Sequence, residues 1–303
     1  YVERPYTLNA GKGWMDAGDY GKYIVNGGIT LWTLMNAFER NPRVFPDGSL
    51  SIPENANGVS DLLDEARWEL EFFLGMQVPE GQRDSGMVHH KLHEKQWLPL
   101  PYKAPERTDD RYAMRPSTAA TLNFAAATAQ ASRVFAPCDK AFAERCLAAS
   151  ERAFAAALAN PAVLFYYVPE DGGGDYDDMK VDDEFFWAAS ELFLSTGKAE
   201  YRERVEKAVA SREYYATLSG ANGPMYWGGT AGLGMLSLLS TKSNLDQSTV
   251  KTIREWLIAG ADRYLLQERE DGYRAPFFEY QWGSNSSVLN KAIILAYAYD
   301  LTG

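Results

Sequence analysis

Apolar side chains recur at helical spacing along most of the chain, and Gly, Pro and Asn cluster between the recurring stretches. Apolar residues at intervals of three and four positions line one face of an α-helix. The pattern predicts helical segments at 20–40, 60–77, 117–135, 139–159, 182–197, 199–212, 229–240, 246–267 and 284–301. No convincing series of alternating apolar and polar positions competes with them. An all-α fold follows, and paired helices closing into a toroid would fit it.

Long loops separate some of these segments, at 41–59, 79–116 and 160–181. Long loops in a compact domain tend to carry functional residues. The helical segments have no fixed sequence period, so the pattern does not indicate a solenoid.

The loop ahead of the first predicted helix carries two carboxylates three positions apart, Asp16 and Asp19, with Gly18 and Gly21 beside them. Glycines remove side-chain bulk, so a substrate can approach the backbone closely. A helix that starts near Tyr20 would place Asp19 at the positive end of the helix dipole, which favours the ionised carboxylate. The pattern fits a general base at Asp19, with Asp16 holding the same water. An N-cap aspartate beside a turn aspartate explains the same spacing, so both interpretations stay open.

The composition is that of a compact globular protein, since 46% of the 303 residues are hydrophobic and 13% are aromatic. We expect a single domain over 1–303. The net charge of −11 argues against a nucleic-acid partner, because phosphates require clustered Lys and Arg. No apolar run is long enough to predict a membrane span. The 8 Trp and 18 Tyr would suit stacking on sugar rings, although core packing is the simpler explanation for any single ring.

The cysteines do not decide the cellular compartment. Cys138 and Cys146 fall on one predicted helix and lie too far apart for an easy disulfide. Low cysteine content fits a cytosolic protein and a bacterial extracytoplasmic protein equally. The chain opens on Tyr1 without a Met, which indicates a processed or trimmed start. We expect a secreted or periplasmic protein.

Five motifs occur in a fixed order along the chain. They are Gly13–Tyr23 (GWMDAGDYGKY), Gly86–Lys91 (GMVHHK), Ser117–Thr121 (STAAT), Asp182–Gly197 (DDEFFWAA, then EL and TG) and Trp282–Asn290 (WGSNS, then LN). Together they resemble the family 9 glycoside hydrolases, and the resemblance runs from Gly13 to Gly303. It implies an (α/α)6 barrel that hydrolyses β-1,4 links of cellulose and related glucans with inversion, without a required cofactor.

The resemblance assigns roles to both aspartates. Asp19 matches the general base and Asp16 its water-orienting partner. An inverting enzyme keeps its base and acid roughly 6.5–9.5 Å apart so that water fits beneath the sugar. Asp16 and Asp19 are therefore not the acid and base pair, because two aspartates on one loop serve the same water.

The general acid of the family is a glutamate near the end of the catalytic domain, and we expect it beyond Gly303. Fewer helices are predicted than the twelve of a complete barrel, so we also expect the first helix ahead of Tyr1 and the last helices after Gly303. Glu279 and Glu170 are the candidates for an internal substitute. We expect the 303-residue chain alone to hydrolyse little, and the complete protein to carry an N-terminal β-sandwich domain.

The resemblance also implies groups that bind the substrate. It places His90 in the cleft as a partner of a sugar hydroxyl, and Trp227 and Trp282 as aromatic platforms. Tyr176 lies after three glycines at 172–174 and would line the cleft as well. A water-exposed loop position is the alternative for His90, and core packing is the alternative for Trp227.

An acidic run spans 175–184, and its last pair, Asp183 and Glu184, matches positions where the family often holds a structural calcium. Carboxylates at a turn into a helix suit Ca²⁺, although a solvated helix start explains them nearly as well. Zinc is a weaker candidate. His89, His90 and His93 cluster on one loop, but no cysteine lies near them in sequence.

Other functions remain open. An exo-acting β-glucosidase or glucosaminidase that acts on oligosaccharides would carry the same motifs, and so would a non-catalytic sugar-binding protein on the same toroid. A helical toroid that binds isoprenoid pyrophosphates through Mg²⁺ is disfavoured, because only Lys12 and Lys22 lie near the paired aspartates.

Overall fold

The computed structural model describes residues 4–97, 103, 110–166, 172–221, 223–276, 280 and 283–303. Within these ranges the chain forms nine α-helices. They are α1 (Ile24–Arg40), α2 (Asp61–Gly75), α3 (Thr118–Phe135), α4 (Lys140–Ala159), α5 (Asp182–Thr196), α6 (Ala199–Ala210), α7 (Ala231–Ser240), α8 (Gln247–Glu270) and α9 (Ser284–Thr302). Each coincides with a predicted segment, so the predicted helices are confirmed. Short 3₁₀ turns occur at Pro42–Val44 (η1) and Thr217–Ser219 (η3).

The first helix begins at Ile24, later than the sequence predicts, because Lys22–Tyr23 form the short strand β1. Strand β1 pairs with β3 (Lys91–Glu94), and β3 pairs with β4 (Arg111–Ala113), both antiparallel. Strand β2 (Val88–His89) pairs with β5 (Pro116–Ser117). These strands were not predicted, since runs of two to four residues carry too little alternation to be recognised. Through the pairing of β1 with β3, the loop after α2 is hydrogen-bonded to the end of the segment that holds Asp16 and Asp19.

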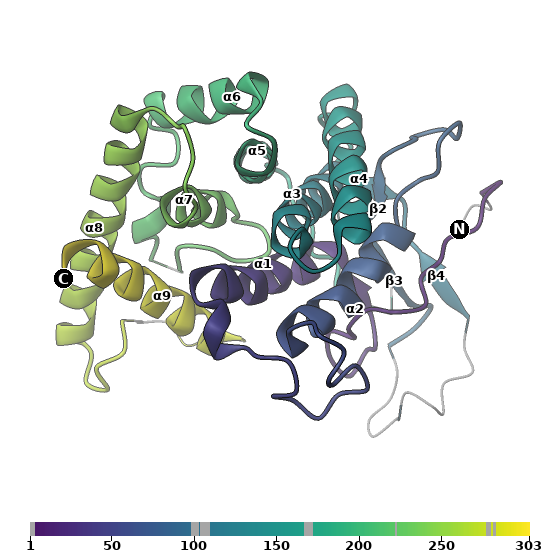
Figure 1. Ribbon diagram of the computed structural model, residues 1–303, viewed down its shortest axis with the longest axis horizontal. Helices are drawn as coiled ribbons and strands as arrows, with labels where there is room; N and C mark the ends of the chain where they lie inside the picture. The colour runs from purple at the N-terminus through teal and green to yellow at the C-terminus, as the bar shows by residue number, and fades with distance from the viewer. Residues whose placement is uncertain are drawn as a thin grey trace.

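Helices α1, α3, α5 and α7 form the interior, and α2, α4, α6 and α8 lie outside them (Figure 1), while α9 packs on α8. Helix α3 packs against α1, α4 and α5, and α5 in turn packs against α6 and α7. Nearly every residue of α3 is buried, and its many alanines and small polar side chains allow this close approach on all sides. The inner and outer arrangement agrees with the expected toroid of paired helices.

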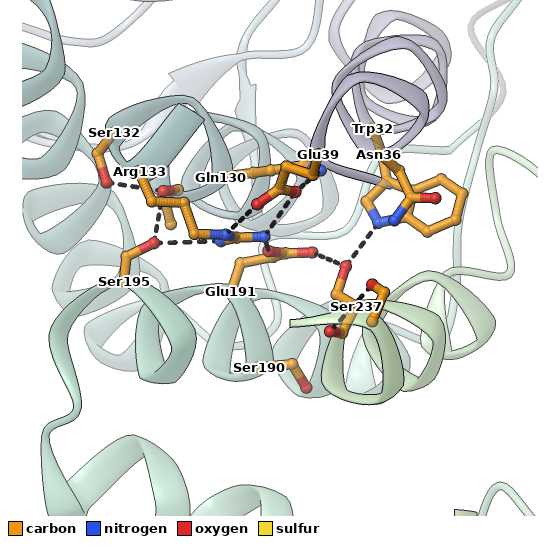
Figure 2. Close-up of polar contacts among 12 residues, drawn as sticks. Trp32, Asn36, Glu39, Gln130, Ser132, Arg133, Ser190, Glu191, Ser195 and Ser237 are labelled. Atoms are coloured by element: carbon orange, nitrogen blue, oxygen red, sulfur yellow. Dashed lines mark hydrogen bonds and ion pairs between the residues drawn. The ribbon is translucent and has the colours of Figure 1, made fainter. Parts of the chain in front are cut away.

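A buried polar network joins four inner helices (Figure 2). The guanidinium of Arg133 on α3 forms ion pairs with Glu39 on α1 at 2.7 Å and with Glu191 on α5 at 2.6 Å. Ser237 on α7 donates to Glu191 at 2.5 Å and accepts the indole N–H of Trp32 at 2.8 Å. Buried charges are tolerated only when they are paired and hydrogen-bonded. The network therefore specifies how α1, α3, α5 and α7 meet.

No helix in the described ranges is long and apolar enough to cross a membrane.

Candidate active site

The segment from Gly13 to Tyr23 forms a tight loop that leads into β1. The amide of Asp16 donates to the carbonyl of Gly21 at 2.8 Å, which closes the loop around Asp19. Gly13 has a φ of +95°, and a Cβ at this position would lie 2.6 Å from atoms of Phe72. Only glycine satisfies both constraints. The loop is thus fixed at its entrance by α2 and at its exit by the β-sheet.

Asp19 is 5% exposed and accepts a hydrogen bond from the hydroxyl of Tyr23. The same hydroxyl accepts the amide N–H of Gly174 at 3.0 Å. Burial, and then the hydrogen bond to Asp19, raises the pKa of Tyr23, so its hydroxyl stays protonated as a donor. The expected helix start near Tyr20 is wrong, because α1 begins at Ile24 and the strand β1 lies between Asp19 and the helix in the sequence. A tyrosine hydroxyl engages the carboxylate.

Asp16 is exposed and is held by side chains from two other elements. The hydroxyl of Tyr176 donates to Asp16 Oδ2 at 2.6 Å, and Asn26 Nδ2 of α1 donates to Oδ1 at 3.2 Å. Burial and the neighbouring Asp16 carboxylate raise the pKa of Tyr176, which keeps its hydroxyl as a donor. The rings of Tyr23 and Tyr176 meet edge to face with centroids 4.8 Å apart. The two aspartates are therefore held by two tyrosines in contact with each other.

The loop around Gly173 brings Tyr176 to this place. A side chain at Gly173 would overlap the hydroxyl of Tyr23, so glycine is required for the close approach. Lys91 of β3 is fully buried and donates to the carbonyl of Gly174 at 2.8 Å. It also forms an ion pair with Asp175 at 3.7 Å. These contacts anchor the glycine loop over the paired aspartates.

His90 lies beneath the same loop and does not line a cleft. It is fully buried, its Nδ1 is 2.8 Å from the hydroxyl of Ser117, and its Nε2 is 3.0 Å from the carbonyl of Asp175. Its ring stacks on Phe165 at 3.9 Å. Burial lowers its pKa to about 3, so the ring is neutral. This placement does not agree with the expected contact to a sugar hydroxyl, because both ring nitrogens already have protein partners.

The other two histidines also bond to separate protein groups. His89 Nε2 lies 2.8 Å from the hydroxyl of Tyr6, and His93 Nδ1 lies 2.5 Å from the carbonyl of Glu94. Over the described residues, no group of three or more His, Cys, Asp or Glu side chains is arranged to hold a metal ion.

Trp227 is half-buried, and its ring packs edge to face on Tyr176 with centroids 5.3 Å apart. Trp227 therefore lies next to the tyrosine that donates to Asp16, and it also packs against the hydrophobic core. Its role as a sugar platform stays a prediction. Trp282, Glu279 and Glu170 lie outside the described residues.

The expected calcium pair begins α5. Asp183 accepts hydrogen bonds from the amide of Thr230 at 2.7 Å and from its hydroxyl at 3.4 Å. Glu184 is fully buried, and neither of its carboxylate oxygens has a hydrogen-bond donor. Burial, then the neighbouring carboxylates of Asp183 and Asp178, raises the pKa of Glu184 well above its ordinary value. Oδ2 of the buried Asp178 also has no donor.

Sequence reasoning missed several residues that shape the site. Tyr23 and Lys91 stand inside recognised motifs, but their partners come from the distant glycine loop. Glu65 and Glu69 of α2 both bond to Trp14, next to the aspartate motif. Their spacing of four positions was a usable signal, since it puts both on one helix face.

The helical assembly and the paired aspartates that accept from Tyr23 and Tyr176 agree with the class of glycoside hydrolases that the sequence motifs resemble. The family model for glycosyl hydrolase family 9 matches residues 2–303. The chain belongs to that family.

Known relatives agree with this assignment. The chain is 44% identical to a cellulose 1,4-beta-cellobiosidase of Acetivibrio thermocellus, over 100% of this chain and 37% of that protein. It is 42% identical to endoglucanase C of Cellulomonas fimi, over 98% of this chain and 27% of that protein. A metagenome-derived family 9 endoglucanase superposes with a TM-score of 0.89 at 35% identity, over 99% of this chain and 54% of that chain. The chain thus spans about half or less of these relatives.

Proposed function

We propose that this chain carries the water-activating half of the active site of an inverting β-1,4-glucanase. The proposal is supported by the placement of Asp16 and Asp19 on one closed loop. Tyr23 donates a hydrogen bond to Asp19, and Tyr176 donates one to Asp16. Fixed carboxylates suit general base catalysis, because a base must stay within hydrogen-bond reach of the proton that it removes. Family membership and the names of the relatives support glucan hydrolysis.

In the proposed reaction Asp19 accepts a proton from water while the water oxygen bonds to the anomeric carbon from the face opposite the leaving group. The glycosidic C–O bond breaks, and a general acid supplies the proton that the leaving oxygen needs. Asp16 accepts a second hydrogen bond from the same water and so orients it. Trp227 provides an apolar face for a sugar ring beside Tyr176.

We further propose that Asp183 and Glu184 bind Ca²⁺ as a structural ion. The carboxylate of Glu184 fits such an ion, because its two buried oxygens have no donor. The described residues hold no group of three or more side chains arranged for a metal ion, so backbone carbonyls and waters would supply the other ligands. Ca²⁺ accepts carboxylates, backbone carbonyls and waters as ligands. The ion would neutralise these buried charges and stabilise the start of α5.

The greater length of the relatives supports further domains in the complete protein, and we propose that an N-terminal β-sandwich is one of them. A polymeric glucan substrate would require the enzyme to act outside the cytoplasm, so we propose that it is secreted or periplasmic.

The test is substitution of each aspartate in the full-length protein, assayed on barley β-glucan and soluble cello-oligosaccharides. We expect Asp19→Asn to lower kcat by about 10²–10⁴-fold with oligosaccharide binding kept, because general base catalysis contributes that much. Asp16→Asn is expected to lower kcat as well, with little change in binding. Asp177→Asn, at an exposed position of the same acidic run, is the control.

Unchanged turnover in Asp19→Asn would contradict the proposal. Binding of glucan without turnover in the unmodified protein would instead identify a sugar-binding protein. Product analysis and parallel assays on aryl glucosides and glucosaminides separate endo-acting from exo-acting enzymes.

A further inference from the structure

Helix α2 directs two carboxylates at a single residue of the catalytic loop. Glu69 Oε2 accepts the backbone N–H of Trp14 at 2.5 Å, and Glu65 Oε1 accepts the indole N–H of the same residue at 2.6 Å. Residues four positions apart lie on the same face of a helix. Both hydrogen-bond donors of Trp14 are therefore bound by α2, two positions ahead of Asp16.

Glu69 is also part of the cavity that Asp16 lines. A pocket of about 250 Å³ is lined by Trp14, Met15, Asp16, Tyr23, Asn26, Gly27, Thr30 and Glu69. Glu69 is 1% exposed, and a side chain at Gly27 would overlap its Oε1. The carboxyl group of Glu69 thus occupies space that is open only because residue 27 of α1 is a glycine. The pocket is smaller than the roughly 300–1,000 Å³ of sites that enclose drug-sized ligands. It fits one ring-sized group better than a chain of sugars.

We propose that Glu69 is a positioning residue for the reaction, which fixes Trp14 and thereby the place of Asp16 in the pocket, with Glu65 holding the indole. The inference rests on the proposed function, because it assigns Glu69 a part in the same hydrolysis. Small displacements of a catalytic group are costly, since about 1 Å of misplacement can lower a rate by about 10²-fold. A hydrogen bond to the backbone at Trp14 restrains the loop more directly than a contact with a mobile side chain.

The carboxyl group of Glu69 is suited to this role as a neutral group. Burial raises its pKa to about 8, against the lowering effect of the Trp14 N–H and of Lys22, and Glu65 raises it further. Asp16 and Tyr23 are the other ionisable groups that line the pocket. Below pH 8 a neutral Glu69 accepts from Trp14 without adding a negative charge beside Asp16. Ionisation above that pH brings a second carboxylate into the same cavity.

The test compares Glu69→Gln and Glu69→Leu in the full-length protein, with kcat and KM measured on soluble cello-oligosaccharides from pH 5 to 9. The amide of glutamine keeps an acceptor for Trp14, so we expect Glu69→Gln to keep kcat within about threefold and to lose any fall in activity near pH 8. Leucine has no acceptor, so we expect Glu69→Leu to lower kcat by about 10–100-fold with KM changed less than twofold. Glu71→Gln on the same helix is the matched control, because Glu71 pairs with Arg67 and Arg145 instead.

A second readout does not depend on activity. In NMR spectra the backbone N–H signal of Trp14 is expected to shift in Glu69→Gln and its indole N–H signal in Glu65→Gln, because each variant changes the acceptor of that group. Both signals, assigned with Trp14→Phe, are expected to stay in place in Glu71→Gln. An unshifted signal would overturn the inference, and so would wild-type kcat in a folded Glu69→Leu. If Glu69→Leu does not fold, an unchanged pH profile in Glu69→Gln still overturns it. If Asp19→Asn keeps full activity while the Trp14 signals shift as expected, the proposed function is contradicted. The hydrogen bonds of Trp14 to Glu65 and Glu69 are then still supported.

Discussion

Tyr23 joins three parts of the site through one hydroxyl group. It donates to Asp19, accepts from the amide of Gly174, and its ring contacts Tyr176. Hydrogen bonds to charged groups contribute about 1.5–3 kcal/mol. The hydroxyl therefore holds both the Asp19 carboxylate and the glycine loop, whereas the ring without its hydroxyl would keep only the contact with Tyr176.

We predict that Tyr23→Phe lowers kcat by about 10–100-fold with a small effect on KM, because it removes this hydrogen bond and keeps the ring. Steady-state kinetics of the full-length protein on soluble oligosaccharides measure the effect. Tyr6→Phe is the control, since the hydroxyl of Tyr6 bonds to His89 and not to an aspartate. Equal kinetics in the two variants would show that the Tyr23 hydroxyl does not restrain Asp19.

Glu69 makes stability depend on pH in a specific direction. Its pKa is raised from 4.5 to about 8 in the folded protein, mainly by burial. Between these values the folded protein keeps a proton that the unfolded chain releases, so the free energy of unfolding falls as pH rises. Glutamine does not titrate. We predict that the melting temperature of Glu69→Gln relative to wild type increases steadily from pH 5 to pH 8, as measured by calorimetry. A constant difference across this interval would mean that Glu69 ionises normally.

At the residue scale the sequence singled out Asp16 and Asp19, because both stand in a short contiguous motif, and their catalytic role stays a prediction. It misplaced His90, whose burial depends on Ser117 and on the carbonyl of Asp175. Partners 27 and 85 positions away leave no mark on the local pattern. The same holds for Tyr23, whose position near the glycine loop follows from the tertiary fold.

At the scale of elements, helices were predictable because each buries an apolar stripe with a period that spans several turns. Strand β1 was not, and it moved the start of α1 to Ile24. Its two residues are extended because they pair with Lys91 and Leu92. That pairing leaves no local signal in the sequence, so the start of the helix was predicted too early.

Contacts between inner helices depend on Arg133. We predict that Arg133→Met lowers the free energy of unfolding by about 3–5 kcal/mol, because the buried Glu191 and the partly buried Glu39 would be left without their cation. Urea denaturation measures the change. Lys140→Met is the control, since its pair with Glu144 is 84% and 68% exposed, and a surface pair contributes at most about 1 kcal/mol. A loss in Arg133→Met no larger than in the control would show that the network does not hold the helices together.

At the scale of the whole molecule, the packing of α5 against α7 connects the acidic cluster to the rest of the fold. Asp183 on α5 accepts the amide of Thr230, the residue that precedes α7. The charges of Asp183 and Asp178 act on Glu184 at this junction, and Glu184 is fully buried without a donor. Their mutual repulsion and burial oppose folding unless protons or a cation neutralise them.

We predict that Ca²⁺ raises the melting temperature of the folded chain and that a chelator lowers it. An ion at a hundredfold excess over its Kd stabilises the folded state by about 2.7 kcal/mol, which for a chain of this size is roughly 5 °C. Glu184→Gln is expected to abolish the response, because it removes a charged ligand from the centre of the cluster, whereas the exposed Asp177→Asn is expected to keep it. Calorimetry with and without the chelator provides the measurement. If wild type melts at the same temperature in both conditions, Ca²⁺ does not bind at this junction. The Glu184 carboxyl group is then neutralised by a proton, in agreement with its raised pKa.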